Sequence, residues 1–311
     1  MINIKLIATS LTTALLIGCV SSTEYGPGAK RAQLMIVSQE LMVNKANHTI
    51  EDDFKREKGV YWSSEERLVN ILNSLIPYAD QFNTKSEPIE WNVNHWYAKQ
   101  FNAGALANGT ILITDRMVSN KLITDADLAY VMAHEMAHVI RQHHREMATW
   151  KYVVQPTVLA TGLATAGLTS TVSLSGRDLY SVGFNKALEK EADELGMVIY
   201  ASAGYDPENA LVLFEKVEPI IKKEKPLASR IPSLISTHPS FSTREKRVKE
   251  NMERYKEIQK AHTPMSSENL IVYKKFSDLQ KLKELSKITF TKDDEIKVNI
   301  NIDTAPNVAR Q

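Results

Sequence analysis

Two histidines and one glutamate, His134, Glu135 and His138, are spaced as metal-assisted hydrolysis requires. On an α-helix, residues four apart lie on one face, so His134 and His138 can present their imidazoles to one ion. Zn²⁺ binds neutral imidazole at about 2.0–2.1 Å and lowers the pKa of bound water toward about 7. Glu135 lies about 100° around the helix from His134, where its carboxylate can take a proton from that water and deliver it to a leaving amine. The pattern predicts a zinc hydrolase; the alternative is a pair of surface histidines on an amphipathic helix.

A catalytic zinc needs a third protein ligand and one open position. Glu189 and Asp193 are four residues apart on a later predicted helix, and therefore share a face. We expect Glu189 to be the third ligand, and Asp193 to accept the other ring N–H of a ligand histidine. Glu191 is an alternative ligand, and a solvated acidic face is the alternative for the whole motif. The expected cofactor is one Zn²⁺ per chain; a purely structural site would favour cysteines, and the sequence has a single one, Cys19.

The elements that must position these side chains follow from periodicity and turn signals. The histidine helix is expected to open at Asp125 and run to about Trp150, and the acidic helix to span 184–203. Strands are expected at 89–97 and 110–114, the second after a turn at Asn108-Gly109. The fold class is mostly α with a small β-sheet (α+β). Further helices are expected over 34–43, 68–76 (with a capping signal at 63–66), from 206–207 onward and over 243–260, with an edge strand at 296–302.

The N-terminus has the layout of a secretory signal peptide, with Lys5 before an apolar run from Leu6 to Ile17. The sequence around Cys19 resembles a bacterial lipobox, which implies cleavage before Cys19 and lipid attachment to its thiol. Val20 in the next position favours, by the same resemblance, the outer membrane on its periplasmic side. The alternative is an incidental cysteine. The expected organisation is a signal peptide over 1–18, a tether over 19–30, a catalytic domain over 31–262 and a C-terminal extension of unknown role over 263–311.

The charge balance gives no reason to expect nucleic acid as a partner, because 38 basic residues face 37 acidic ones in 311. Apolar residues make up 43% and charged residues 24%, as in ordinary globular proteins. The stretch 152–176 carries no charge. It is rich in glycine, serine and threonine, which favours a buried or lid-forming helix, with membrane contact as the alternative.

The two motifs together resemble peptidase family M48, the family of HtpX, the CAAX prenyl proteases, Oma, BepA and LoiP, over roughly residues 65–250, and the periplasmic lipoprotein branch in particular. The resemblance implies a gluzincin-type zinc metallopeptidase domain. It also implies that the segment 101–111 forms the edge of the substrate cleft, so that Asn102, Ala103, Gly104 and Ala105 would bind an extended polypeptide by strand addition. This chain has Ala107-Asn108 where the family often has Pro-Gly, which affects the expected turn geometry.

Further residues take their expected roles from the same resemblance. His238, before Pro239, would approach the metal, either as an extra ligand at rest or as a donor to the developing oxyanion. Arg244 would brace the site through a carboxylate, and His143 would be structural. The remaining histidines, His48, His95, His144 and His262, are expected to be ordinary residues.

The implied function is a zinc endopeptidase of the bacterial envelope, lipid-anchored at the outer membrane, that cleaves misfolded or misassembled proteins. The alternative is an outer-membrane assembly factor or chaperone with secondary or latent proteolysis. In that case His238 as a fourth ligand would keep the site silent.

Overall fold

The computed structural model describes residue 27 and residues 33–55, 62–63, 65–83, 88–96, 101–154, 170–223 and 241–262. The predicted signal peptide, Cys19, His238 and the edge strand predicted at 296–302 lie outside these ranges, as do most of the predicted tether and all of the C-terminal extension predicted over 263–311. Within the described ranges the protein is mostly helical with one small sheet, as predicted.

The sheet has four strands, β1 (Trp62–Ser63), β2 (Asn92–Trp96), β3 (Ala103–Ala105) and β4 (Thr110–Thr114), in the order β1-β2-β4-β3. β2 runs parallel to β4, whereas β1 and β3 are antiparallel to their neighbours. The turn between β3 and β4 is closed by two backbone hydrogen bonds, in which the Leu106 N–H donates to the Thr110 carbonyl and the Gly109 N–H donates to the Leu106 carbonyl. Gly109 has a φ of 94°, which suits glycine. The predicted turn is therefore confirmed, and β3 is left as an edge strand.

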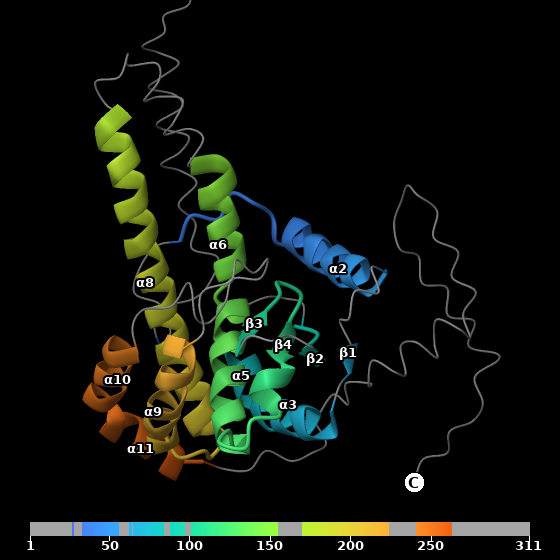
Figure 1. The fold of residues 1–311 in the computed structure, drawn as a ribbon, viewed down its shortest axis with the longest axis vertical. Coiled ribbons are helices and arrows are strands. Elements are labelled where there is room, and N and C mark those ends of the chain that lie inside the picture. Colours follow the sequence, from blue (N-terminus) through green and yellow to red (C-terminus); the bar gives the residue numbers. More distant parts are fainter. Residues whose placement is uncertain are drawn as a thin grey trace, which may run out of the picture. The chain divides into compact units, whose positions relative to one another are not determined.

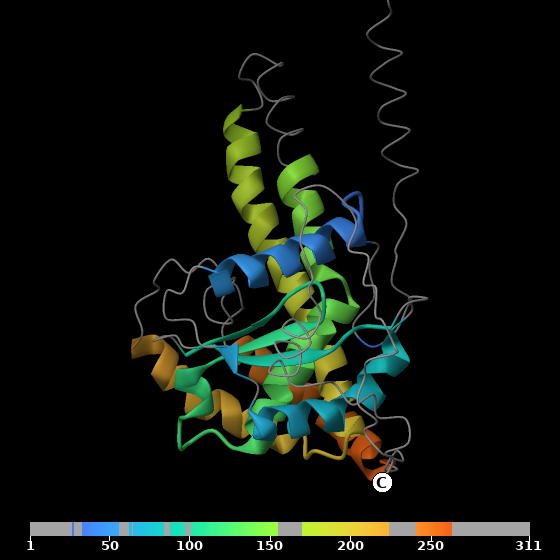
Figure 2. The ribbon, with the colours of Figure 1, turned by 90° about the vertical axis from the view of Figure 1, so that its right-hand side faces the viewer.

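Helix α5 (Asp125–Ile140) lies between the sheet and helix α8 (Ser170–Ser202), as Figures 1 and 2 show. The α5 N-terminus is fixed by a reciprocal pair of hydrogen bonds, in which Asp127 N–H donates to Thr124 Oγ1 and Thr124 N–H donates to Asp127 Oδ2. Nearly every side chain of α5 is buried. Because a buried polar side chain is unfavourable unless it is hydrogen-bonded, paired or bound to a metal, the polar side chains of this covered helix, including both histidines, require interaction partners in the interior.

The predicted continuation of the histidine helix to Trp150 is wrong. Gln142 adopts the left-handed conformation, with φ 53° and ψ 34°, and a separate helix α6 (His143–Thr149) follows, with the π-helical turn η2 (Trp150–Val154) after it. The acidic helix, in contrast, begins at Ser170, well before the predicted residue 184. Of the uncharged stretch 152–176, the first residues belong to η2 and the last to α8, and 155–169 lie outside the described residues.

The helix predicted at 34–43 is displaced, because α2 spans Gln39–Lys55. Residues 33–38 instead lie along α6, where the Ile36 and Val37 N–H groups donate to Thr149 Oγ1 and the Arg145 guanidinium donates to the carbonyls of Met35 and Val37. These tertiary hydrogen bonds replace the helical ones. The segment is thereby fixed beside α6, which directly follows the histidine helix.

The remaining helices surround α5. Helix α3 (Glu66–Ala79) packs on it and extends beyond the predicted range 68–76 at both ends, so that Pro77 lies inside the helix. The helix begins at the signal predicted over 63–66, although its N-cap residue Glu65 forms no side-chain cap. Helix α9 (Glu208–Lys223) is tied to α5 by Lys216 Nζ, which lies 2.7 Å from Asp127 Oδ2. The short helix α4 (Asp115–Val118) follows β4, and the predicted helix at 243–260 is divided at Asn251 into α10 (Phe241–Glu250) and α11 (Met252–Lys260).

Candidate metal centre

His134, His138 and Glu189 bring three ligand atoms together in the interior. The two Nε2 atoms are 3.1 Å apart, and the Glu189 carboxylate oxygens lie 3.4 Å from His134 Nε2 and 3.5 Å from His138 Nε2. Two ligands of a tetrahedral ion, each about 2.0 Å from the ion, are about 3.3 Å apart. The spacing of the three donors and their chemistry, two imidazoles and a carboxylate, therefore fit Zn²⁺ with three protein ligands and one open position.

The packing of α5 against α8 sets this spacing. The histidines lie one turn apart on α5, and Glu189 faces them from α8. All three residues are buried, with exposed fractions of 1%, 8% and 4% in chain order. Burial without an ion would leave the acceptor atoms of three polar groups against one another, which is unfavourable unless a cation or protons lie between them.

His134 is held from behind by a buried ion pair. Asp193 Oδ1 lies 3.2 Å from His134 Nδ1, and Arg244 donates to the same oxygen through Nε at 2.9 Å and Nη2 at 2.6 Å. Burial alone would raise the pKa of Asp193, but Arg244, His134 and Arg247 hold that pKa well below its ordinary value. Asp193 is therefore an anion, which favours the His134 tautomer with its proton on Nδ1 and with the acceptor nitrogen Nε2 on the side of the ligand cluster.

His138 is held from behind by another histidine. His143, at the start of α6, places Nδ1 2.9 Å from His138 Nδ1, and its Nε2 lies 3.1 Å from Glu191 Oε2 on α8. Glu191, the alternative ligand in the sequence, thus lies in a contact behind the metal-binding face, away from the ligand cluster formed by His134, His138 and Glu189.

Glu135 is buried next to His134 and faces the edge strand β3. Burial raises the pKa of Glu135, while the charges of His134 and Arg244 and a hydrogen bond from the Ala105 backbone lower it. Since the burial effect is the largest, the carboxyl group has a higher proton affinity than an exposed glutamate. That is the property expected of a group that accepts a proton and later returns it.

The residues predicted to bind substrate lie at the start of the sheet edge. Ala103, Gly104 and Ala105 form β3, and the Asn102 backbone pairs with Thr114 immediately before it. Because pairing alternates along an antiparallel strand, the backbone groups of Ala103 and Ala105 point away from β4. The Ala105 backbone contacts Glu135 and His144 on that side, so the sheet edge and the buried carboxylate are adjacent.

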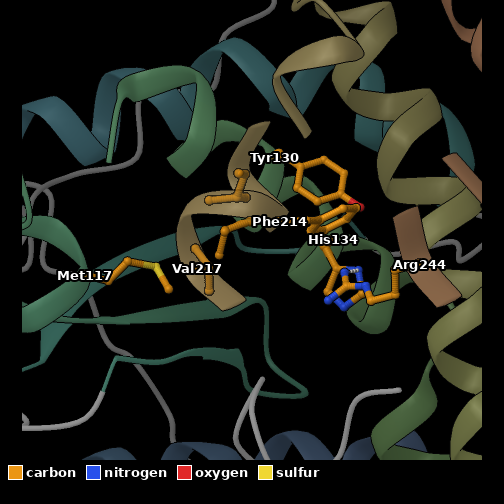
Figure 3. Close-up of a pocket in the computed structure, with 8 residues that line it drawn as sticks. Met117, Tyr130, His134, Phe214, Val217 and Arg244 are labelled. Atoms are coloured by element: carbon orange, nitrogen blue, oxygen red, sulfur yellow. Dashed lines mark hydrogen bonds between the residues drawn. The ribbon is translucent and has the colours of Figure 1, made fainter. Parts of the chain in front are cut away.

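An apolar pocket lies beside His134 on the side of α9 (Figure 3). Figure 3 shows Phe214 and Val217 of α9 facing it, with His134 and Arg244 side by side at one end and Met117 at the other. The lining is apolar apart from His134, Arg244 and the hydroxyl of Tyr130. The residues that line the pocket are Met117, Tyr130, Val131, His134, Leu213, Phe214, Val217 and Arg244.

The four histidines expected to be ordinary lie away from the three-ligand cluster. His95 lies between Glu65 and Asp115, His262 contacts the carbonyl oxygen of Ser202, and His48 is exposed on α2. Burial and then the charge of His143 lower the pKa of His144 from 6.5 to about 4.

Two buried imidazoles and a carboxylate around one point, on helices next to an edge strand, define a metallopeptidase-type site. Comparison with known proteins supports this class, because the sequence model of Peptidase family M48 matches residues 63–252. The chain belongs to this family, and the matched region is a metallopeptidase domain of the hydrolase class.

Three relatives are similar over part of their length. A mitochondrial metalloendopeptidase OMA1 from Arabidopsis thaliana is 29% identical over 57% of this chain and 36% of its own. A beta-barrel assembly-enhancing protease from Yersinia pestis is 25% identical over 75% of this chain and 50% of its own. The protein of the same name from Escherichia coli strain K12 is 28% identical over 45% of this chain and 30% of its own length. The aligned region thus spans about half or less of the length of these relatives.

Reasoning from the sequence missed two features of the site. The contact between His143 and Glu191 depends on the helix break at Gln142, which no proline or glycine signals. The close approach of α8 to α5 depends on Gly196, seven residues after Glu189 and hence on the same face, a spacing that could have been noticed.

Proposed function

We propose that this chain is a zinc endopeptidase in which His134, His138 and Glu189 hold one Zn²⁺ and Glu135 moves the proton. The observation that carries the proposal is the convergence of the three buried ligand atoms within 4.8 Å of one another, beside Glu135. The ion, when bound, supplies a Lewis acid that lowers the pKa of water toward about 7 and polarises a carbonyl group.

The residues of the chain perform the remaining steps. Glu135 accepts a proton from the attacking water and delivers it to the nitrogen of the leaving amine. Asp193 orients His134 and is held by Arg244. A substrate segment pairs in extended form with the outward-facing backbone of Ala103, next to Asn102, Gly104 and Ala105, which aligns its scissile bond with Glu135.

A casein assay tests this mechanism. Zinc-loaded protein should hydrolyse unfolded casein, and Glu135→Gln should lower the rate by at least about 10²-fold while retaining one zinc per chain, because proton transfer of this kind contributes about 10²–10⁴-fold. The exposed Glu215→Gln on α9 is the matched control and should retain activity. Equal hydrolysis by the Glu135 variant would exclude the mechanism.

The substrates we propose are misfolded or misassembled proteins of the bacterial envelope. The proposal is supported by the name of two relatives, beta-barrel assembly-enhancing protease, and by the signal-like N-terminus.

We also propose that residues 1–18 are a signal peptide, that the Cys19 thiol carries lipid at the periplasmic face of the outer membrane, and that the tether over 19–30 precedes the domain over 31–262. Among the helices that the structure describes, none is long and apolar enough to cross a bilayer. Labelling with radioactive palmitate should fail for Cys19→Ala, and that variant should leave the membrane fraction.

A role as an assembly factor is the second candidate, favoured by the same name. In this case His238 would act as a fourth ligand that keeps the zinc silent. The two functions can be distinguished in cells. If the protein acts as an assembly factor, a Glu135→Gln strain should behave like the wild type. If it acts as a protease, that strain should behave like a deletion strain. His238→Ala should raise casein hydrolysis if His238 blocks the ion, and lower it if His238 stabilises the oxyanion.

A further inference from the structure

The two candidate histidine ligands differ in what holds the nitrogen that faces away from the metal position. His134 Nδ1 lies against a carboxylate, 3.2 Å from Asp193 Oδ1. His138 Nδ1 lies 2.9 Å from another imidazole nitrogen, His143 Nδ1, and the carboxylate of Glu191 comes only after it, 3.1 Å from His143 Nε2. The second arrangement therefore has one more hydrogen bond in series than the first.

The direction of each hydrogen bond in this series follows from the proposed ligand role of His138. A neutral histidine that binds a metal through Nε2 carries its proton on Nδ1. His138 Nδ1 must then donate, and His143 Nδ1 must accept. A neutral His143 that accepts at Nδ1 has its proton on Nε2, and this N–H faces the acceptor oxygen of Glu191. The carboxylate at the far end thus selects the tautomer of both imidazoles.

The local backbone is built to allow this contact. Five residues of continuous α-helix would rotate His143 by about 140° away from His138 around the helix axis. The helix instead breaks at Gln142, which has a positive φ of 53°, unfavourable for a residue with a Cβ atom. The break directs the His143 side chain into the interior, where its exposed fraction is 0%. An unfavourable backbone conformation four residues after the candidate ligand His138 points to a functional constraint.

We propose that His143 and Glu191 are positioning residues for His138, forming a relay in which Glu191 fixes His143 and His143 fixes the metal-binding tautomer and ring orientation of His138. The proposal rests on the proposed zinc site and extends it to two residues that do not themselves bind the ion. It accounts for a buried glutamate within the acidic motif that is not a ligand, and for the helix break after Ile140.

Zinc affinity measured with a competing fluorescent chelator tests the relay without relying on catalysis. Glu191→Gln should weaken zinc binding by about 10–100-fold, the range typical of partners that orient ligand histidines. The matched control is Glu194→Gln on the same helix, because the Glu194 carboxylate lies 3.9 Å from the exposed Lys190 and should leave zinc affinity unchanged when neutralised. Circular dichroism of the zinc-free variants should match the wild type, so that weaker binding is not a result of misfolding. Affinity of Glu191→Gln within twofold of the wild type would overturn the proposal.

A rescue experiment separates the relay from a general packing role. The Oδ1 atom of an aspartate and the Nδ1 atom of a histidine are both bonded to Cγ, so His143→Asp places a carboxylate oxygen near the position of His143 Nδ1. Combined with Glu191→Gln, this change keeps the number of acidic groups and gives His138 the direct carboxylate contact that His134 has with Asp193. The double variant should bind zinc at least fivefold more tightly than Glu191→Gln alone, and its Co²⁺-substituted form should regain the wild-type visible spectrum. A double variant that binds no better than the single one would show that the two residues act through packing, and would overturn the relay.

Wild-type measurements distinguish failure of the relay from failure of the proposed function. If the wild type binds no zinc, the metal site itself is wrong. If the wild type binds zinc and Glu135→Gln abolishes hydrolysis while Glu191→Gln retains full affinity, the peptidase proposal stands and only the relay fails.

Discussion

Gly196 of α8 lies against the backbone of His134, such that a Cβ atom at Gly196 would be 2.8 Å from His134 Cα and 3.0 Å from His134 N. These neighbours are backbone atoms of a buried helix and cannot rotate away. Because glycine has only a hydrogen in place of a Cβ atom, the helix that carries Glu189 can approach the helix that carries the two histidines this closely.

Gly196→Ala should separate the two helices. Alanine normally stabilises a helix interior by about 1 kcal/mol relative to glycine, but overpacking should reverse the sign here and lower the free energy of unfolding by about 1–3 kcal/mol. Zinc affinity should fall as well, because the ligands move apart. Urea denaturation and chelator competition would measure the two effects. Ser202→Ala on the same helix should change neither, and a more stable Gly196→Ala protein would contradict the packing argument.

Asp193→Asn should be more damaging than removal of a surface charge. It leaves the buried Arg244 guanidinium, which donates two hydrogen bonds to Asp193 Oδ1, without its counter-ion. Breaking a buried pair in this way costs about 3–5 kcal/mol, and this loss should appear in urea denaturation of the zinc-free protein. The comparison variant is Glu245→Gln, which removes an exposed pair with Lys249 on α10 and should leave the free energy of unfolding nearly unchanged, because solvent screens such pairs. Equal losses in the two variants would refute the role of burial.

His144 should make stability depend on pH between its unfolded and folded pKa values, 6.5 and about 4. In this window the unfolded chain binds a proton that the folded chain does not, so stability is fully present above pH 6.5 and declines as the pH falls toward 4. The lost stability is on the order of 2–3 kcal/mol. Denaturation of zinc-free protein at pH 7 and pH 4.5 should show a smaller difference for His144→Gln than for wild type, whereas the exposed His48→Gln should retain the wild-type difference. An unchanged pH dependence in His144→Gln would assign the effect to other groups.

Val217→Phe should destabilise the protein, because Val217 is 3% exposed and faces the small apolar pocket beside His134 (Figure 3). A larger ring would overpack this part of the core and lower the free energy of unfolding by about 1–3 kcal/mol. Urea denaturation of the zinc-free protein would measure this loss. Val212→Phe, at an exposed position of the same helix, is the control, and an equal loss in both variants would argue against close packing around the pocket.

The sequence was sufficient to predict the elements that carry the strongest local patterns. The opening of α5 near Asp125, the turn at Asn108-Gly109 and strand β4 follow from capping, turn and β-branched residues that act locally. The spacing of His134 and His138, and the later placement of Glu189, likewise led to the three residues that the fold brings together.

The remaining features depend on tertiary contacts that no local pattern encodes. The helix was predicted to continue past Gln142 because residues 141–150 include no glycine or proline, whereas the contact of His143 with Glu191 favours the break. The segment before Gln39 has helical periodicity, but its backbone hydrogen-bonds to Thr149 and Arg145, more than a hundred residues away. Likewise, only the fold reveals that Glu191 faces a histidine.

The separation of the site residues along the chain has a consequence for biosynthesis. The proposed ligands lie on two helices, with Glu189 51 residues after His138, and the arginine that holds Asp193 follows 51 residues after that aspartate. A nascent chain that has emerged only as far as α6 holds two of the three ligands and neither carboxylate behind them. Hydrolytic capacity would therefore arise only when most of the domain has been synthesised, which would protect the ribosome-bound or translocating chain, and its neighbours, from premature cleavage.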